Sequence, residues 1–112
     1  LTATYYGKLD IENGGFHQFF GNTTGVFAPE MVEWFERSGM VESARIVREA
    51  INVFGTRFPR SQHERKSFLD KYKVATREEW DPFYEMNEMF YAATKDEAFQ
   101  TKANHWLRDV CN

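Results

Sequence analysis

The chain has 112 residues, a net charge of −3 and 42% hydrophobic residues, and 17% of the sequence is aromatic. This length corresponds to one domain, and the hydrophobic content excludes a disordered chain. The negative charge argues against a strongly basic nucleic-acid-binding protein. The single cysteine, Cys111, excludes an intrachain disulfide and a zinc site built from several cysteines. No apolar run approaches the ~20 residues that a membrane-spanning helix needs.

The first quarter of the chain predicts a helix, a break and a second helical segment. A short first helix is expected over residues 3–12. The Asn-Gly-Gly sequence at 13–15 ends it, because Asn and Gly tolerate the left-handed conformation of a helix C-cap. Residues 16–20 then form a compact aromatic turn or short helix, and residues 21–25 form a polar loop. Three side chains of the first helix are available for burial: Tyr5, Tyr6 and Leu9.

Two further helices are expected before the middle of the chain. The first covers residues 29–37, where Pro29 suits the first turn, Glu30 favours the positive end of the helix dipole, and Gly39 stops the helix. The second covers residues 41–54, in which apolar residues recur with helical periodicity. Its apolar residues are Val41, Ala44, Val47, Ile51 and Phe54.

Three capping boxes, in which Ser or Thr precedes Glu by three residues, punctuate the second half at 61–64, 76–79 and 94–97. The first opens a helix. A proline follows the second too closely for one unbroken helix, so a helix is expected over residues 82–91, capped by Asp81. The third box opens the final helix. The buried sides of the first and last of these helices comprise Phe68, Leu69 and Tyr72, and Phe99, Ala103, Trp106 and Val110, respectively.

The predicted fold is therefore all-α: a single compact domain, residues 1–112, of about six helices with short loops. Only residues 53–58 are compatible with a strand. The first third of the chain is dense in aromatic side chains. They are expected to form core, with the alternative that two or three stay exposed as an interface patch. These residues are Tyr5, Tyr6, Phe16, Phe19, Phe20, Phe27, Trp34 and Phe35.

Charges are segregated along the sequence. Residues 9–36 contain five acids and no Lys or Arg, a second acidic block lies at 78–88, and basic residues gather at 57–77. We predict that the two acidic blocks meet on one surface, not neutralised by the basic segment, and bind a basic protein. The alternative is that these acids lie on solvent-exposed helix faces and form no binding surface. The predicted surface comprises Asp10, Glu12, Glu30, Glu33, Glu36, Glu78, Glu79, Asp81, Glu85 and Glu88.

We expect no enzymatic activity, no metal site and no cofactor. The three histidines, His17, His63 and His105, lack metalloprotease spacing. His105 and Asp109 are four residues apart on a predicted helix, a spacing more typical of a surface contact than of a metal site. Cys111 has no base near it in the sequence, and no serine lies in a nucleophile-elbow pattern.

One run in the first third has a distinctive composition: Asn13-Gly14-Gly15-Phe16-His17-Gln18-Phe19-Phe20-Gly21-Asn22-Thr23-Thr24-Gly25. It resembles the signature of the DNA-mimic protein family, a bacterial domain of unknown function with an Asn-Gly-Gly-Phe-x-Gln-Phe-Phe-x-Asn core. The resemblance implies a helical domain, often dimeric. A characterised member presents carboxylates in place of DNA phosphates and occupies the DNA-binding surface of a transcription factor, which requires acids that face Lys and Arg on the partner.

Within this motif the resemblance implies mainly structural roles. The glycines supply backbone freedom, the phenylalanines fill the core, and two carboxamides tie the loop through their side chains. The motif residues are Asn13, Gly14, Gly15, Phe16, Gln18, Phe19, Phe20, Asn22 and Gly25. At two positions the family often carries an acid where this chain has His17 and Val26.

Taken together, these features predict a non-catalytic protein-interaction domain in the bacterial cytoplasm. Its expected partner is a basic protein, such as a transcription factor or another DNA-binding protein, bound through the acidic surface as a DNA mimic. The resemblance is compatible with a homodimer, and no direct contact with nucleic acid or membrane is expected.

Two other functions remain open on the sequence alone. In one, the 13–25 loop builds a small-ligand-binding or hydrolytic site on which His17, Gln18 and Asn22 converge. In the other, the chain is a structural or immunity-type module that binds through exposed aromatic residues on the face of Trp34, buried in a symmetric dimer.

Overall fold

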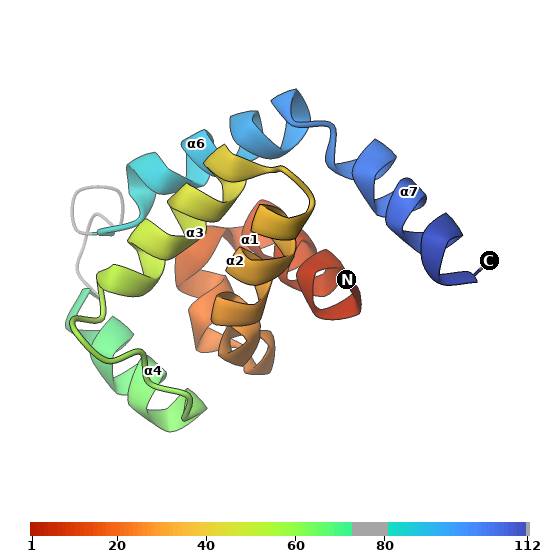
Figure 1. The fold of residues 1–112 in the computed structure, drawn as a ribbon. Coiled ribbons are helices and arrows are strands. Elements are labelled where there is room, and N and C mark those ends of the chain that lie inside the picture. The colour runs from red at the N-terminus through yellow and green to blue at the C-terminus, as the bar shows by residue number, and fades with distance from the viewer. Residues whose placement is uncertain (73–80, 112) are drawn as a thin grey trace.

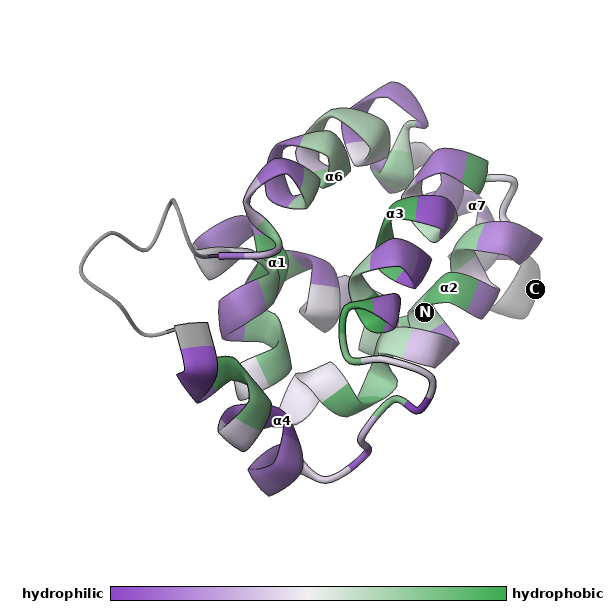
Figure 2. Ribbon diagram, turned by 90° about the vertical axis from the view of Figure 1, so that its left-hand side faces the viewer, coloured by the Kyte–Doolittle hydropathy of each residue, from purple (hydrophilic) through white to green (hydrophobic). Residues whose placement is uncertain are grey.

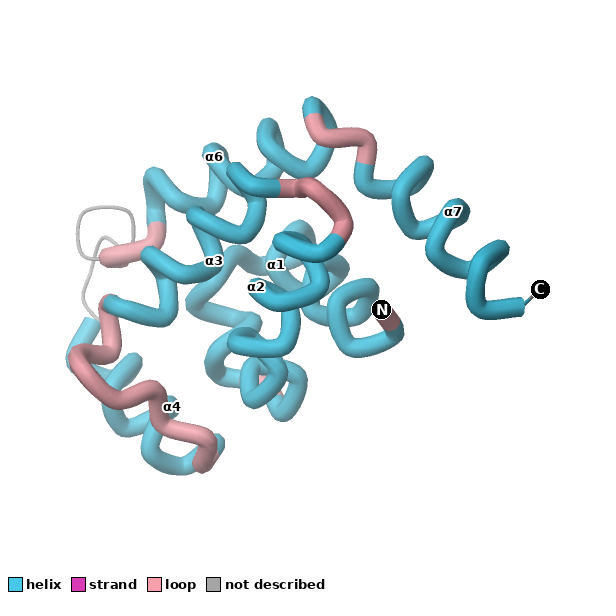
Figure 3. The backbone as a smooth tube through the Cα atoms, viewed as in Figure 1, coloured by secondary structure: helices cyan, strands magenta, loops and turns pink. Residues whose placement is uncertain are grey.

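The computed structural model describes residues 1–72 and 81–111, and all regular structure in those residues is helical (Figures 1 and 3). The elements are α1 (Thr2–Gly21), η1 (Thr23–Phe27), α2 (Ala28–Arg37), α3 (Val41–Asn52), α4 (Gln62–Leu69), η2 (Asp70–Tyr72), α6 (Tyr84–Asp96) and α7 (Phe99–Cys111). The predicted all-α fold is therefore confirmed, and residues 53–58 form turns and loop. Within the described ranges, no helix is both long enough and apolar enough to cross a membrane.

Helix α1 is two helical segments joined at Gly15. That residue has a φ of 76°, which breaks the helix where the sequence predicts a break. Two side chains of α6 hold the break: Asn87 Oδ1 accepts a hydrogen bond from the Phe16 amide at 2.9 Å, and the Tyr91 hydroxyl donates to the Ile11 carbonyl at 2.8 Å. They satisfy backbone groups that a helix leaves unpaired at its ends. A Cβ on Gly15 would lie 2.6 Å from Asn87 Nδ2.

The core is built around phenylalanine rings from the second segment of α1. Phe16, Phe19 and Phe20 are fully buried, as the sequence predicts. The Phe16 ring lies 5.5 Å from that of Phe90 in α6, and the Phe20 ring lies 5.4 Å from that of Phe83. Aromatic pairs at such separations add to the free energy of burial. The motif segment, residues 13–25, is thus the centre around which α2, α4 and α6 pack, and α3 packs in turn against α2 and α6.

Helices α2 and α3 form a hairpin through Gly39, whose φ of 77° suits the turn after α2. Helix α6 lies along α3 (Figure 1), and hydrophobic and hydrophilic residues alternate along both helices (Figure 2), as expected where one face is buried. Trp34 of α2 is buried, with its ring 5.6 Å from that of Phe99. With 7% of its surface exposed, Trp34 adds little to an exposed aromatic patch.

The buried face of the first α1 segment differs from the prediction. Tyr5, Tyr6 and Leu9 are 43%, 56% and 44% exposed. The reason is close packing at Gly7, where a Cβ would lie 2.4 Å from Met31 Sδ. The buried face therefore runs along Thr4, Gly7 and Ile11, and the three larger side chains lie outside it. Among the other aromatic residues of the first third, Phe27 is also exposed, at 42%.

Several predicted boundaries and faces are corrected. The polar loop at 21–25 is partly helical as η1, and the helix predicted over 82–91 is α6, which continues to Asp96. The 94–97 box opens no helix, because Thr94 lies inside α6 and its hydroxyl donates to the Phe90 carbonyl at 3.0 Å. The break comes at Ala98, with a φ of 56°. Val41, predicted on the apolar face of its helix, is 66% exposed.

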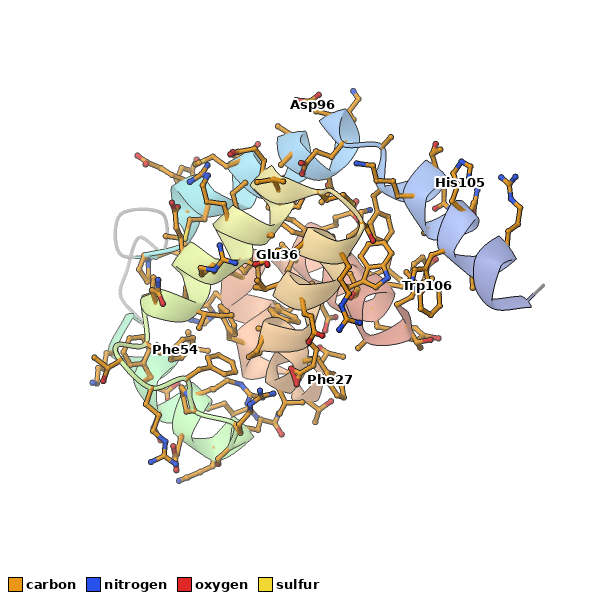
Figure 4. All side chains as sticks on the ribbon, viewed as in Figure 1. Phe27, Glu36, Phe54, Asp96, His105 and Trp106 are labelled. Atoms are coloured by element: carbon orange, nitrogen blue, oxygen red, sulfur yellow. The ribbon has the colours of Figure 1, made fainter. Side chains whose placement is uncertain are left out.

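Helix α7 projects from the body of the molecule (Figure 1). Phe99 and Ala103 are each 4% exposed, as predicted, but Trp106 is 40% exposed because the helix leaves the core beyond its second turn. His105 and Trp106 lie on different sides of the helix (Figure 4). The predicted burial of Tyr72 and Val110 and the capping box at 76–79 lie outside the described residues and side chains.

Candidate functional site

The first acidic block is paired within the chain. Along α1, Glu12 lies 2.5 Å from Lys8, and along α2, Glu33 lies 2.6 Å from Arg37. Both pairs are four residues apart on a helix and exposed. Such pairs add little stability, but they neutralise the carboxylate locally.

The other acids of this block are held across elements. Glu30 pairs with Arg60 at 2.6 Å, and Arg60 also donates to the Val26 carbonyl at 2.7 Å. Glu36 pairs with Arg48 between α2 and α3 (Figure 4). Asp10 accepts a hydrogen bond from the Thr24 hydroxyl. All five acids of residues 9–36 therefore have a partner in the chain. For one of them, Glu30, that partner is Arg60 of the basic segment at 57–77.

The second acidic block is arranged differently. Asp81 Oδ1 accepts from the Phe83 amide at 2.9 Å, at the entry to α6. Glu85 and Glu88 are exposed on α6 and form no ion pair within the described part of the chain. Burial, with Glu88 and then Glu12 nearby, raises the pKa of Tyr91 above its ordinary value. Glu78 and Glu79 lie outside the described residues.

Two adjoining hollows lie along the seam between α3 and α6, with volumes of about 270 and 330 Å³. Their linings contribute six carboxylates and, among the residues that the structure describes, no Lys, Arg or His. The smaller hollow is lined by Glu42, Ile46, Met89, Ala92, Ala93, Asp96 and Glu97. The larger is lined by Glu49, Asp81, Pro82, Tyr84, Glu85, Met86 and Met89. We call these residues together the α3–α6 groove.

The groove has an apolar floor between two acidic rims. Ile46 and Ala93 are buried in the floor, whereas Met89 is 39% exposed and lines both hollows. On α6, the spacing of Glu85, Met89 and Asp96 places the three residues on one helix face. Asp96 lies at the outer end of this face (Figure 4). Neither Glu85 nor Asp96 forms an ion pair within the described ranges.

The α3 rim is held in place by two sets of contacts. Arg45 lies 2.8 Å from Glu42 and 2.5 Å from Glu49, and its hydrogen bond lowers the pKa of Glu42. The Glu97 carboxylate accepts from the amides of Glu42 and Ser43 at 3.1 and 2.8 Å and from the Ser43 hydroxyl at 2.7 Å. Glu97 thus caps the N-terminus of α3 from the end of α6.

Of the predicted acids that lie within the described residues, the structure brings only Asp81 and Glu85 into this groove. The residues missed were Glu42, Glu49, Asp96 and Glu97. A signal existed for the first two, because a spacing of seven residues places both acids on one face of α3. The last two were assigned to a capping box for the following helix, whereas the chain uses them at the end of α6.

The motif segment borders a separate hollow of about 440 Å³. Its lining is Gly14, His17, Gln18, Gly21, Asn22, Lys66, Leu69 and Asp70. Among the described residues, the predicted tie through the Gln18 and Asn22 side-chain amides is not found, and a backbone bond holds this point instead: the Asn22 amide donates to the Gln18 carbonyl at 3.0 Å. Asn13 is exposed at the end of the first α1 segment.

Arg65 of α4 holds the motif segment through hydrogen bonds to its backbone. It is fully buried and donates to four carbonyls: Phe20 at 2.8 Å, Asn22 at 3.0 Å, Pro59 at 3.2 Å and Arg60 at 2.7 Å. Burial, with the charge of Arg60 second, lowers the pKa of its guanidinium. Gly25 is required next to it, because a Cβ there would lie 2.6 Å from the Phe19 carbonyl oxygen.

Within the described residues, no group of three or more His, Cys, Asp or Glu side chains is placed to hold a metal ion. His17, His63 and His105 belong to three different helices. The absence of enzymatic activity stays a prediction.

Comparison with known proteins gives one result. The family model described as DMP19-like protein matches residues 1–110. No curated protein and no solved structure matches the chain. The family match covers nearly the whole chain and agrees with the resemblance drawn from the sequence, since DMP19 is a DNA-mimic protein family. The chain therefore belongs to the DMP19-like family.

Proposed function

We propose that this domain is a non-catalytic interaction protein that binds a DNA-binding protein through the α3–α6 groove, in the place that DNA would take. Family membership supports the DNA-mimic role. The groove is proposed as the binding site because its lining has six carboxylates and, among the described residues, no cationic side chain. A partner that meets DNA in the bacterial cell implies a cytoplasmic location for this domain.

The geometry of the rims supports this proposal. DNA-binding surfaces present Lys and Arg to the phosphates of two strands that flank a groove. Here Glu42 and Glu49 lie on one rim, about 10 Å apart along α3, and Glu85 and Asp96 lie on the other, about 16 Å apart along α6. The partner's cations would meet carboxylates on both sides. Of these four, only the two α3 acids share an internal cation, Arg45.

The test uses the chain as bait for proteins of a bacterial extract. The proposal requires that a retained protein is a DNA-binding protein, that duplex DNA displaces it, and that its affinity falls as salt rises from about 50 to 500 mM. The groove variant Asp81→Asn/Glu85→Gln/Asp96→Asn should weaken binding at least tenfold, since it removes three negative charges. The Asn at position 81 keeps an acceptor for the Phe83 amide.

A matched control removes the same number of charges from the first acidic block: Glu30→Gln/Glu33→Gln/Glu36→Gln. These acids are already paired, so binding should change less than threefold. Equal losses in the two variants would favour diffuse electrostatic attraction over the groove. Loss only in the control would move the binding surface to α2, and binding that DNA and salt leave unchanged would contradict the proposal.

A second candidate function uses the hollow beside the motif segment. It is favoured by one observation: His17, Gln18 and Asn22 line the same space of about 440 Å³, together with Lys66 of α4. An NMR titration of the labelled chain with a set of small polar fragments tests it. Chemical-shift changes confined to these residues, and abolished by Asn22→Ala, would support a ligand site there.

A further inference from the structure

The middle of the α3–α6 groove is apolar, which a purely electrostatic DNA mimic does not need. Met89 lines both hollows and is 39% exposed, and Tyr84 in the larger hollow is 49% exposed. Ala92 lies beside Met89 and is exposed in the smaller hollow. Exposed apolar side chains at the centre of a polar rim are typical of binding sites on proteins.

The shape of the site suits a helix. Helices α3 and α6 pack against each other, and the seam between two packed helices is a groove into which the side-chain ridge of a third helix fits. Met89 divides the seam into hollows of about 270 and 330 Å³ that follow each other along it. Side chains on successive turns of one helix would enter one hollow and then the next.

The charge of the rims selects the occupant. Six carboxylates repel nucleic acid and anionic lipid, and they attract a helix that carries Lys or Arg beside its apolar residues. Recognition helices of DNA-binding proteins have this composition, since they hold basic residues for phosphate and guanine together with apolar residues that contact the thymine methyl group.

We propose that the occupant of the α3–α6 groove is one basic amphipathic helix of the DNA-binding partner, with an apolar side chain seated on Met89. This inference rests on the proposed function, because it takes the partner to be a DNA-binding protein held by the acidic rims. Met89 offers the apolar contact that thymine methyl groups offer in the major groove. Binding therefore has a salt-independent part in addition to the electrostatic one.

The experiment uses two synthetic peptides of about 16 residues, long enough to span about 24 Å as a helix. Both carry Arg along two flanks. The first has Leu at successive-turn positions between the flanks, and the second has Ser there. Affinity for the full chain is measured by calorimetry over a range of salt concentrations, and the binding site is mapped by NMR of the labelled chain.

We expect the Leu peptide to bind about tenfold more tightly than the Ser peptide and to shift the amides of Ile46, Met89 and Ala92. Met89→Ala should weaken the Leu peptide about fivefold at every salt concentration and leave the Ser peptide unchanged. The control Leu107→Ala truncates an exposed apolar residue on α7 and should change neither affinity. Circular dichroism confirms that each variant keeps its helices.

The possible failures can be told apart. Three results would overturn the proposal that a helix seats an apolar side chain on Met89: equal affinities of the two peptides, no effect of Met89→Ala, or chemical-shift changes on another face. In each case, salt-dependent binding would still support the acidic groove. If neither peptide shows salt-dependent affinity, or if Asp81→Asn/Glu85→Gln/Asp96→Asn leaves that dependence intact, the proposed function itself fails.

Discussion

Arg65 offers the sharpest test of how the motif segment is held. Its guanidinium is fully buried and donates to the carbonyls of Phe20, Asn22, Pro59 and Arg60. Two of these carbonyls lie at the end of α1, where the helix dipole favours a cation. No carboxylate pairs with Arg65 in the described part of the chain. In the described part of the chain, four backbone carbonyls, together with the Phe58 ring 6.0 Å from the guanidinium carbon, therefore compensate the buried charge.

The magnitude follows from these contacts. A hydrogen bond to a charged group contributes about 1.5–3 kcal/mol, but desolvation of the guanidinium offsets part of the gain from four such bonds. Truncation also removes a buried aliphatic stem and leaves carbonyls without donors. We expect Arg65→Ala to lower the free energy of unfolding by about 3–4 kcal/mol, a large share of the ~6–17 kcal/mol available to a domain of this length. Arg65→Lys should cost about 2 kcal/mol, because an ammonium group cannot reproduce the planar set of donors.

Urea unfolding followed by circular dichroism measures these changes, and the melting temperature of Arg65→Ala should fall by roughly 12–16 °C. The control is Arg57→Ala, which truncates an exposed arginine and should change stability by less than about 0.5 kcal/mol. If Arg65→Ala unfolds within about 1 kcal/mol of the parent chain, the four contacts do not hold the segment and the reasoning is refuted.

Three further predictions concern contacts made by or close to α6. Gly15→Ala should cost about 2 kcal/mol, but about 1 kcal/mol less in an Asn87→Ala background, and an additive double-mutant cycle would contradict the proposed clash. Glu97→Ala should cost about 1–2 kcal/mol by uncapping α3, against less than about 0.5 kcal/mol for the neighbouring Asp96→Ala, both measured by urea unfolding. Because the pKa of Tyr91 is raised in the folded state, its contribution is present below pH ~10 and is lost as pH rises through the folded pKa. Tyr91→Phe should therefore cost about 1 kcal/mol at pH 7 and reduce the alkaline loss of stability, and an unchanged alkaline profile would refute this.

The fold could be predicted largely from local chemistry. Three local signals act within a few residues, and each lies where it was predicted: the Asn-Gly-Gly break, the proline at the start of α2 and the Ser61 cap of α4. At the cap, the Ser61 hydroxyl accepts from the Glu64 amide at 3.4 Å. What failed depended on distant packing. The exposure of Tyr5 follows from the contact of Gly7 with Met31, which no local pattern reveals.

The binding surface was harder to predict because charge along a sequence does not show pairing in space. Glu30 meets Arg60 from a segment thirty residues away, which neutralises an acid within a stretch of sequence that lacks Lys and Arg. The α3–α6 groove, in contrast, draws its carboxylates from α3, from α6 and from the residues that flank α6, Asp81 and Glu97, which are far from α3 in the sequence. Among the predicted acids that the structure describes, only Asp81 and Glu85 line the groove, because they lie at the start of α6 on the side that faces α3.

The motif and the groove are linked through opposite faces of α6. Asn87 and Tyr91 face α1 and hold its break at Gly15, whereas Met89 and Glu85 face the groove. A family signature rich in Gly and Phe therefore need not contact a partner to matter for binding, since it fixes the helix that forms one rim. It follows that Gly15→Ala, which carries no charge change and lies outside the groove, should weaken partner binding as it displaces α6. Asn13→Ala in the same motif should leave binding unchanged, because the Asn13 side chain is exposed and forms no hydrogen bond to α6 within the described residues.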